Sequence, residues 1–82
     1  TMAGAIECGN PVYGLEALMA VHQTKGKILS VSESRLAHAK LSLARKEGLY
    51  SEYSGAAIQA ILEDYSFPGT TVAILGGHGL KE

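Results

Sequence analysis

Apolar residues recur at helical spacing in the first third of the chain. Asn10 supplies a capping oxygen and Pro11 suits a first helical position, where no N–H partner is needed. These residues predict a helix from Pro11 to about Thr24, with Gly26 placed to end it. Its apolar stripe has positions i, i+3, i+4 and i+7 occupied by Leu15, Leu18, Met19 and His22.

Two further helices follow the same logic. Ser32 can cap a helix that continues to Glu47, where Gly48 supplies a left-handed stop. Its apolar positions form two stripes, Leu36, Ala39, Leu43 and Ala37, Leu41, Ala44. A third helix starts at Ser54 or Gly55 and is expected to bury a face made of Ala57, Ile58, Ile61, Leu62 and Tyr65.

Continuous apolar runs between the helices predict short buried strands over residues 27–32 and 70–75, with residues 3–7 as a third candidate. Parallel strands need a crossover connection, and the helices between them provide one. The expected fold class is therefore α/β, with a small parallel sheet of two or three strands and about three helices. So small a sheet leaves apolar surface uncovered, so we expect the chain to be part of a larger domain and to associate with itself when alone.

Composition excludes several classes of partner. Seven basic and eight acidic residues nearly cancel among 82 residues, which gives no footprint for nucleic acid or an anionic membrane. No apolar run approaches the roughly 20 residues that span a bilayer. The single cysteine, Cys8, fits a reducing compartment, and a cytoplasmic location is expected.

The most prominent candidate for chemistry is the glycine turn that follows residues 70–75. Ligands in open parallel sheets lie beyond the carboxyl ends of strands, where Gly76, Gly77 and Gly79 are found. Glycine there lets backbone N–H groups approach a ligand, although the three could equally make a tight exit from the sheet. His78 within the turn is either a general base or an ordinary loop histidine. Histidine, cysteine and carboxylate spacing does not indicate a metal site.

A second candidate is Glu52, just before the third helix. A helix that begins at Ser54 directs free N–H groups toward whatever Glu52 approaches, which suits an anion or the polar edge of a cofactor. The alternative is an ordinary capped helix with a solvated carboxylate.

Taken together, several stretches resemble the C-terminal portion of threonine synthase, and the resemblance covers essentially the whole chain. The most specific is the ending Gly77-His78-Gly79-Leu80-Lys81 with an acidic residue after it. The piece that begins at Glu52 is shared more widely among fold-type II pyridoxal-phosphate enzymes. The stretches are residues 1–6, Gly9-Asn10-Pro11-Val12, Val31-Ser32-Glu33, Glu47-Gly48, Glu52 with Ser54-Gly55-Ala56-Ala57, and residues 77–82.

The resemblance implies a pyridoxal 5′-phosphate enzyme that converts O-phosphohomoserine and water to threonine and phosphate, with the cofactor as electron sink. It implies that residues 1–82 are a single C-terminal fragment of the large domain, inactive alone and without a catalytic residue of its own. The Schiff-base lysine and the phosphate-binding loop belong to family segments upstream. Gly76, Gly77 and Glu52 are the expected cofactor-binding residues, beside a small amino-acid substrate.

Two positions depart from the family pattern. Gly76 stands where the family has a threonine or serine whose hydroxyl meets the pyridine nitrogen, and Tyr53 replaces the usual proline. These departures leave open a related enzyme, such as a cysteate synthase or a threonine dehydratase. A binding or interaction module without catalysis is the alternative from another class, and an upstream reading frame that encodes the lysine and glycine loop would exclude it.

Overall fold

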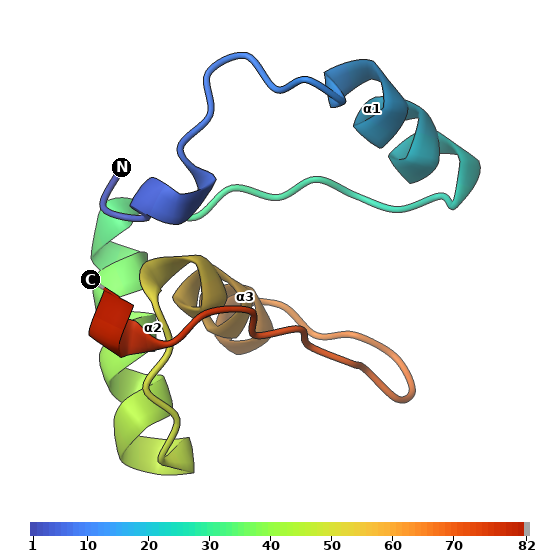
Figure 1. The fold of residues 1–82 in the computed structure, drawn as a ribbon. Helices are drawn as coiled ribbons and strands as arrows, with labels where there is room; N and C mark the ends of the chain where they lie inside the picture. The colour runs from blue at the N-terminus through green and yellow to red at the C-terminus, as the bar shows by residue number, and fades with distance from the viewer. Residues whose placement is uncertain (82) are drawn as a thin grey trace.

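Three α-helices joined by long coil make up the structure, a computed structural model that describes residues 1–81. The helices are α1 (Gly14–Gln23), α2 (Glu33–Glu47) and α3 (Tyr53–Asp64). Short 3-10 turns occupy Gly4–Ile6 and Gly79–Lys81. Figure 1 shows α2 and α3 crossing each other, with α1 at the end of a long excursion of the chain.

The α2–α3 pair holds the hydrophobic core. Ala39 on α2 meets Ala56 and Ala60 on α3, and all three side chains are fully buried. Methyl side chains let two helix backbones approach closely, so the contact is tight although it is small. Leu36 and Leu43 of α2 are also buried, which confirms the first predicted stripe of that helix.

The ends of α2 are as the sequence predicts. Ser32 caps its start, because the Ser32 hydroxyl accepts a hydrogen bond from the Arg35 N–H at 3.3 Å. Gly48 ends it in the left-handed region, with φ of 68°. At the start of the helix, the Glu33 carboxylate accepts from the Met2 N–H at 2.8 Å and so fixes the first residues to α2. A hydrogen bond from the Thr1 side chain, and then this one, lower the pKa of Glu33.

A group of polar side chains, here called the α2–α3 ion cluster, also joins the two helices. The Arg35 guanidinium donates to both Asp64 carboxylate oxygens, at 3.1 and 2.9 Å, and to Glu63 at 3.0 Å. The Ser42 hydroxyl donates to the other Glu63 oxygen at 2.9 Å. Hydrogen bonds, first from Ser42 and then from Gln59 and Arg35, lower the pKa of Glu63. Asp64, and after it Glu63, raise the pKa of Arg35.

The predicted parallel sheet is wrong: residues 1–81 contain no strand, and the α/β class is replaced by three helices. Residues 27–32 and 70–75 run as coil, and residues 3–7 contain a 3-10 turn. The physical reason is that a strand exists only through hydrogen bonds to a neighbour. The backbone groups of residues 70–75 make no hydrogen bond to any described residue, so nothing holds them in a ladder.

Two helix details also differ from expectation. Helix α1 begins at Gly14 without a side-chain cap, so Asn10 does not cap it, and the left-handed residue after the helix is Lys25. Helix α3 begins at Tyr53, one residue before the predicted start. Its predicted apolar face is not the face that packs best, because Gly55, Ala56 and Ala60 are buried, whereas Ile58, Leu62 and Tyr65 remain exposed. Ala57 and Ile61 of the predicted face are half-buried.

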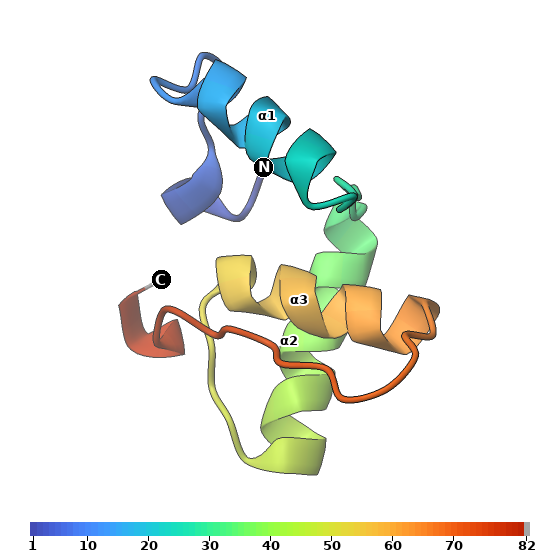
Figure 2. The ribbon, with the colours of Figure 1, turned by 90° about the vertical axis from the view of Figure 1, so that its right-hand side faces the viewer.

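Residues 7–30, here called the α1 arm, stand away from the α2–α3 pair in both views (Figures 1 and 2). Large apolar side chains of α1, among them Leu15, Leu18 and Met19, are exposed. The radius of gyration is 13.5 Å, where a compact chain of this length has about 11.7 Å. None of the helices in residues 1–81 has both the length and the apolar character needed to cross a bilayer.

Candidate functional site

The candidate site forms where the loop before α3 meets the glycine turn near the end of the chain. Ser51 and His78 face each other as an isolated antiparallel bridge. On either side of it, the Glu52 N–H donates to the Gly77 carbonyl at 3.1 Å and the Gly79 N–H donates to the Tyr50 carbonyl at 2.7 Å. These backbone bonds bring together two segments that lie about 25 residues apart in the sequence.

Glu52 is the best-fixed charged group of this site. Its side chain is only 8% exposed, and one carboxylate oxygen accepts from the Ser54 hydroxyl at 2.9 Å. The other oxygen lies 3.7 Å from the Lys81 ammonium group. A Cβ atom at Gly77 would overlap the carboxylate, at 1.9 Å from Oε1, so glycine is what lets Glu52 lie flat against this backbone.

Gly79 is fitted to its surroundings in the same way. A Cβ there would lie 2.7 Å from carbons of the Tyr50 ring, and Gly79 itself is buried. Gly76 is different, because no atom lies within 4 Å of where its Cβ would be. Two of the three predicted glycines are therefore needed for close approach to the chain's own side chains, and Gly76 alone presents open backbone.

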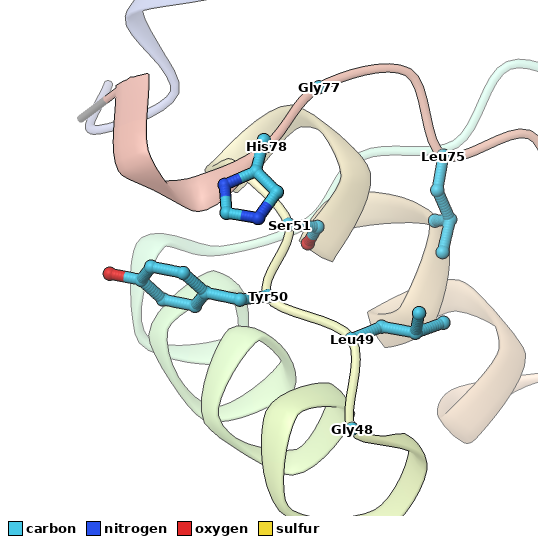
Figure 3. Close-up of a pocket in the computed structure, with 7 residues that line it drawn as sticks. All are labelled: Gly48, Leu49, Tyr50, Ser51, Leu75, Gly77 and His78. Atoms are coloured by element: carbon cyan, nitrogen blue, oxygen red, sulfur yellow. The ribbon is translucent and has the colours of Figure 1, made fainter.

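A shallow pocket of about 350 Å³ opens beside the bridge. Figure 3 shows the His78 and Tyr50 rings on one side of Ser51 and Leu75 on the other. The two rings meet edge to face, with centroids 5.8 Å apart. The Leu80 N–H donates to His78 Nδ1 at 3.0 Å, so the neutral imidazole carries its proton on Nε2.

Ser51 has a hydroxyl oxygen that is buried and has no hydrogen-bond partner among residues 1–81. A buried hydroxyl without a partner is uncommon and costs on the order of 1–3 kcal/mol. Its presence in the pocket wall marks a place where a polar group from outside these residues would be stabilised.

Of the predicted cofactor-binding residues, the structure brings Glu52 and Gly77 into contact, with Gly76 next to them at the open end. The pocket and Glu52 do not coincide, since Gly77 lines the pocket but the Glu52 carboxylate does not. The site offers one buried carboxylate and one stretch of open backbone. The open backbone at Gly76 leaves room for the edge of a planar ring, but these residues by themselves enclose no ring. The role of Glu52, Gly76 and Gly77 in binding a cofactor stays a prediction.

Two lysines, Lys40 and Lys81, lie near this site, and each contacts side chains of the chain itself. The Lys40 ammonium group lies over the rings of Tyr53 and Tyr50, at 4.2 and 5.0 Å from their centroids. Lys81 faces Glu52. Within residues 1–81 no three histidine, cysteine or acidic side chains are grouped closely enough to hold a metal ion.

Sequence reasoning did not find the parts played by Lys81, Ser51 and the Tyr50–Lys40–Tyr53 stack. Lys81 pairs with Glu52 only because the 3-10 turn Gly79–Lys81 folds back toward α3. No spacing rule links residues so far apart in the chain. For the stack, the sequence held one hint. Tyr53 stands where the family has proline, and an aromatic ring can make a cation–π contact with a lysine such as Lys40.

Comparison with curated proteins finds threonine synthases. The chain is 36% identical to the threonine synthase of Methanocaldococcus jannaschii over 88 aligned positions, which take in all of this chain and 22% of that protein. It is 35% identical to the threonine synthase of Bacillus sp. strain ULM1, over all of this chain and 25% of the Bacillus protein. The enzyme of Methanosarcina acetivorans is 38% identical over 22% of its length.

The resemblance to threonine synthase is therefore confirmed, and the chain is a threonine synthase-like region. The chain spans about a quarter of the length of the curated relatives it matches. No family model matches the chain. No solved structure matches it either.

Proposed function

We propose that these 82 residues act within a threonine synthase-like enzyme that depends on pyridoxal 5′-phosphate and forms threonine and phosphate from O-phosphohomoserine and water. The observation that carries the proposal is similarity to threonine synthases over the entire chain, at 35–38% identity to three of them. The cofactor supplies an electron sink when it is bound. This chain's contribution is one wall of the site, with the lysine that holds the cofactor located elsewhere.

The contact between Glu52 and Gly77 supports this assignment. Glu52 is buried, fixed by Ser54 and Lys81, and lies against the backbone that leads to Gly76. A carboxylate fixed in advance next to open backbone can orient a polar ring without a conformational search. At Gly76 no hydroxyl is present, so a nitrogen at the ring edge would take its hydrogen bond from water or from another group.

The missing hydroxyl at Gly76 is also the observation that favours the second candidate, a related enzyme of the same cofactor class with another amino-acid substrate, such as a cysteate synthase or a threonine dehydratase. A change at the ring nitrogen alters how far the cofactor can accept electrons, so it bears on the reaction more than on the fold. We place the protein in the cytoplasm, in keeping with its balanced charge and its single free cysteine.

A graft tests the proposed function. Residues 1–82 replace the matching quarter of the Bacillus sp. threonine synthase, and the purified chimera is assayed for retained cofactor absorbance and for phosphate release from O-phosphohomoserine. We expect cofactor to be retained, and Glu52→Gln to weaken cofactor affinity about tenfold or more, as loss of a fixed charged contact does. Glu47→Gln, at the exposed end of α2, is the matched control and should leave cofactor affinity unchanged.

Two results would contradict the proposal. The first is a folded chimera that holds cofactor with the same affinity whether residue 52 is glutamate or glutamine. The second is a stable covalent cofactor band on the 82-residue chain alone, since that would put the essential lysine within these residues. Retained cofactor with turnover of a different amino acid would favour the second candidate.

A further inference from the structure

Lys81 places a positive charge beside the buried carboxylate of the candidate site. Its ammonium group lies 3.7 Å from Glu52 Oε2, and the Glu52 side chain is 8% exposed whereas the Lys81 side chain is 64% exposed. An ionised carboxylate with so little access to water is stable only when hydrogen-bond donors and opposite charge replace its hydration. The partners of Glu52 therefore decide whether its carboxylate stays in this position.

The two oxygens of the Glu52 carboxylate have partners of different kinds. Oε1 accepts a hydrogen bond from the neutral Ser54 hydroxyl at 2.9 Å, and Oε2 faces the Lys81 ammonium group. The side chain caps no N–H group of α3, although residue 52 is the N-cap of that helix. Ser54 thus supplies a hydrogen bond, and Lys81 supplies the opposite charge.

Backbone contacts hold Lys81 in place for this role. In the 3-10 turn that contains it, the Gly79 N–H donates to the Tyr50 carbonyl at 2.7 Å, and the Lys81 N–H donates to the His78 carbonyl at 3.2 Å. The Leu80 N–H donates to His78 Nδ1 at 3.0 Å, and the His78 ring lies beside Tyr50 on the loop before α3 (Figure 3). Because the turn is fixed to this loop, only the Lys81 side chain has to be ordered for the ion pair to form.

The other lysine near the site, Lys40, has a different environment. Its ammonium group lies over the Tyr53 and Tyr50 rings, 4.2 and 5.0 Å from their centroids. Among the described residues, the ion pair of Glu52 is made with Lys81. The positive charge that compensates Glu52 is therefore the one at position 81.

The position of the Glu52 carboxylate matters because of the backbone beside it. The carboxylate lies flat against Gly77, where a Cβ atom would overlap it, and the open backbone of Gly76 comes next along the chain. A buried carboxylate whose compensating charge is removed gains stability by turning out to water. Loss of the charge at Lys81 would thus move Glu52 away from the open backbone that a ligand approaches.

We propose that Lys81 is a positioning residue of the candidate site. Its ammonium group keeps the Glu52 carboxylate against Gly77, so the affinity of the site for a planar polar ligand depends on a positive charge at position 81. Lys81 acts through Glu52 and does not itself contact the ligand, as outer residues that orient a binding group do. The identity of the ligand as pyridoxal 5′-phosphate rests on the proposed function, whereas the effect of Lys81 on Glu52 does not.

The first experiment uses the free 82-residue chain without cofactor. Glu52 Cγ would lie 2.7 Å from a Cβ at Gly77, so the Glu52 Hγ and Gly77 Hα protons are close enough to give an NMR cross-peak. We expect this cross-peak in the unchanged chain and in Lys81→Arg, which keeps a positive charge, and one about threefold weaker or less in Lys81→Gln. Lys46→Gln removes the same charge at an exposed position of α2 and should leave the cross-peak unchanged.

Salt gives a second measurement that needs no variant. The Lys81 side chain is mostly exposed, so about 1 M sodium chloride, which shortens the screening length to about 3 Å, should weaken the cross-peak in the unchanged chain. In Lys81→Gln, whose helix content is checked by circular dichroism, the same salt should have no further effect. A cross-peak of the unchanged chain that does not respond to salt would count against the ion pair.

The second experiment measures cofactor affinity in the chimera with the Bacillus sp. enzyme. We expect Lys81→Gln to weaken cofactor affinity about tenfold, as Glu52→Gln does, and Lys81→Arg to stay within about threefold of the unchanged chimera. Because Lys81 acts through Glu52, the double variant should be no weaker than either single variant. Lys46→Gln is again the matched control and should leave the affinity unchanged.

Three results would overturn the inference. One is a full Glu52–Gly77 cross-peak in folded Lys81→Gln, and another is equal weakening in Lys81→Gln and Lys46→Gln. The third is a double variant whose loss of affinity is the sum of the two single losses, since Lys81 would then act on the ligand directly. If the cross-peak depends on the charge at position 81 but the chimera retains no cofactor, the role of Lys81 toward Glu52 stands and the proposed function fails.

Discussion

The α2–α3 pair and the α1 arm contain similar helices, yet only one of them is packed. In the pair, three buried alanines, a capped helix start and the α2–α3 ion cluster act on the same contact. In the arm, α1 has a stripe of larger apolar side chains that contact little and remain exposed. Apolar residues stabilise a helix only when something covers them, so small side chains in a formed contact outweigh large ones without a partner.

The glycine turn lies on the border between these two kinds of region. From Gly77 onward the backbone is fixed to the loop before α3, whereas residues before Gly76 run as unpaired coil. The candidate site thus has one fixed edge and one open edge. The contrast between a packed region and an uncovered region is therefore repeated within the candidate site.

The strongest test of this comparison is a methyl-to-isobutyl change in each region. Ala60→Leu should destabilise the chain by about 1–3 kcal/mol, because the fully buried alanine has no room for added carbons. Ala20→Leu on the exposed α1 should change stability by less than about 0.5 kcal/mol. Urea unfolding followed by circular dichroism measures both. Equal losses would mean that α1 is packed in solution.

A smaller effect on stability is expected from alanine substitutions at Gly77 and Gly76, which lie on the fixed and the open side of the glycine turn. Gly77→Ala would push the Glu52 carboxylate away from the backbone and so disturb its contacts with Ser54 and Lys81, at a cost of roughly 1 kcal/mol or more. Gly76→Ala meets no atom within 4 Å and should be close to neutral. The same urea titration gives the difference. A loss at Gly76 as large as that at Gly77 would show that the open edge is closed.

The smallest expected effect is the pH dependence of the stability of the α2–α3 pair. The pKa of Glu63 is lowered from its usual 4.5 in the folded state, so its contribution to stability is present above that value. The contribution is lost as the pH falls below about 4.5 toward the folded-state pKa. Urea midpoints at pH 7 and pH 3 should therefore differ less in Glu63→Gln than in the unchanged chain.

Glu16→Gln, on the α1 arm and outside the α2–α3 ion cluster, is the control for this measurement. It should keep the acid-induced loss of stability of the unchanged chain. If Glu63→Gln and Glu16→Gln reduce the pH dependence equally, the ion cluster does not stabilise the pair.

Local signals predicted the helices well, and non-local structure decided the rest. Ser32 and Gly48 bound α2 because a capping hydroxyl and a left-handed glycine act within one turn of the helix. For α3, the predicted apolar face was the more hydrophobic one. The tertiary contact selected the neighbouring face with Gly55, Ala56 and Ala60, because two helices approach most closely where side chains are smallest.

The sheet prediction failed for a different reason. The apolar run over residues 70–75 is typical of a buried strand. A strand also needs a neighbour that makes backbone hydrogen bonds with it, and the sequence pattern of one segment does not show whether that neighbour is present. Within residues 1–81 no neighbouring strand accepts or donates to it, so the segment is coil. For the site, glycines and Glu52 were recognisable from sequence, whereas the pairing of Glu52 with Lys81 required the fold.

By itself, the sequence determined both ends of α2, the positions of α1 and α3 to within a few residues, and which residues resemble those of threonine synthase. These depend on side-chain sterics and hydrogen bonds over a few residues. Only the tertiary structure decided that alanines form the core, that Glu52 lies against Gly77, and that the apolar arm and coil stay uncovered. Those outcomes depend on which surfaces are available to meet, and a single chain does not encode the surfaces of its partner.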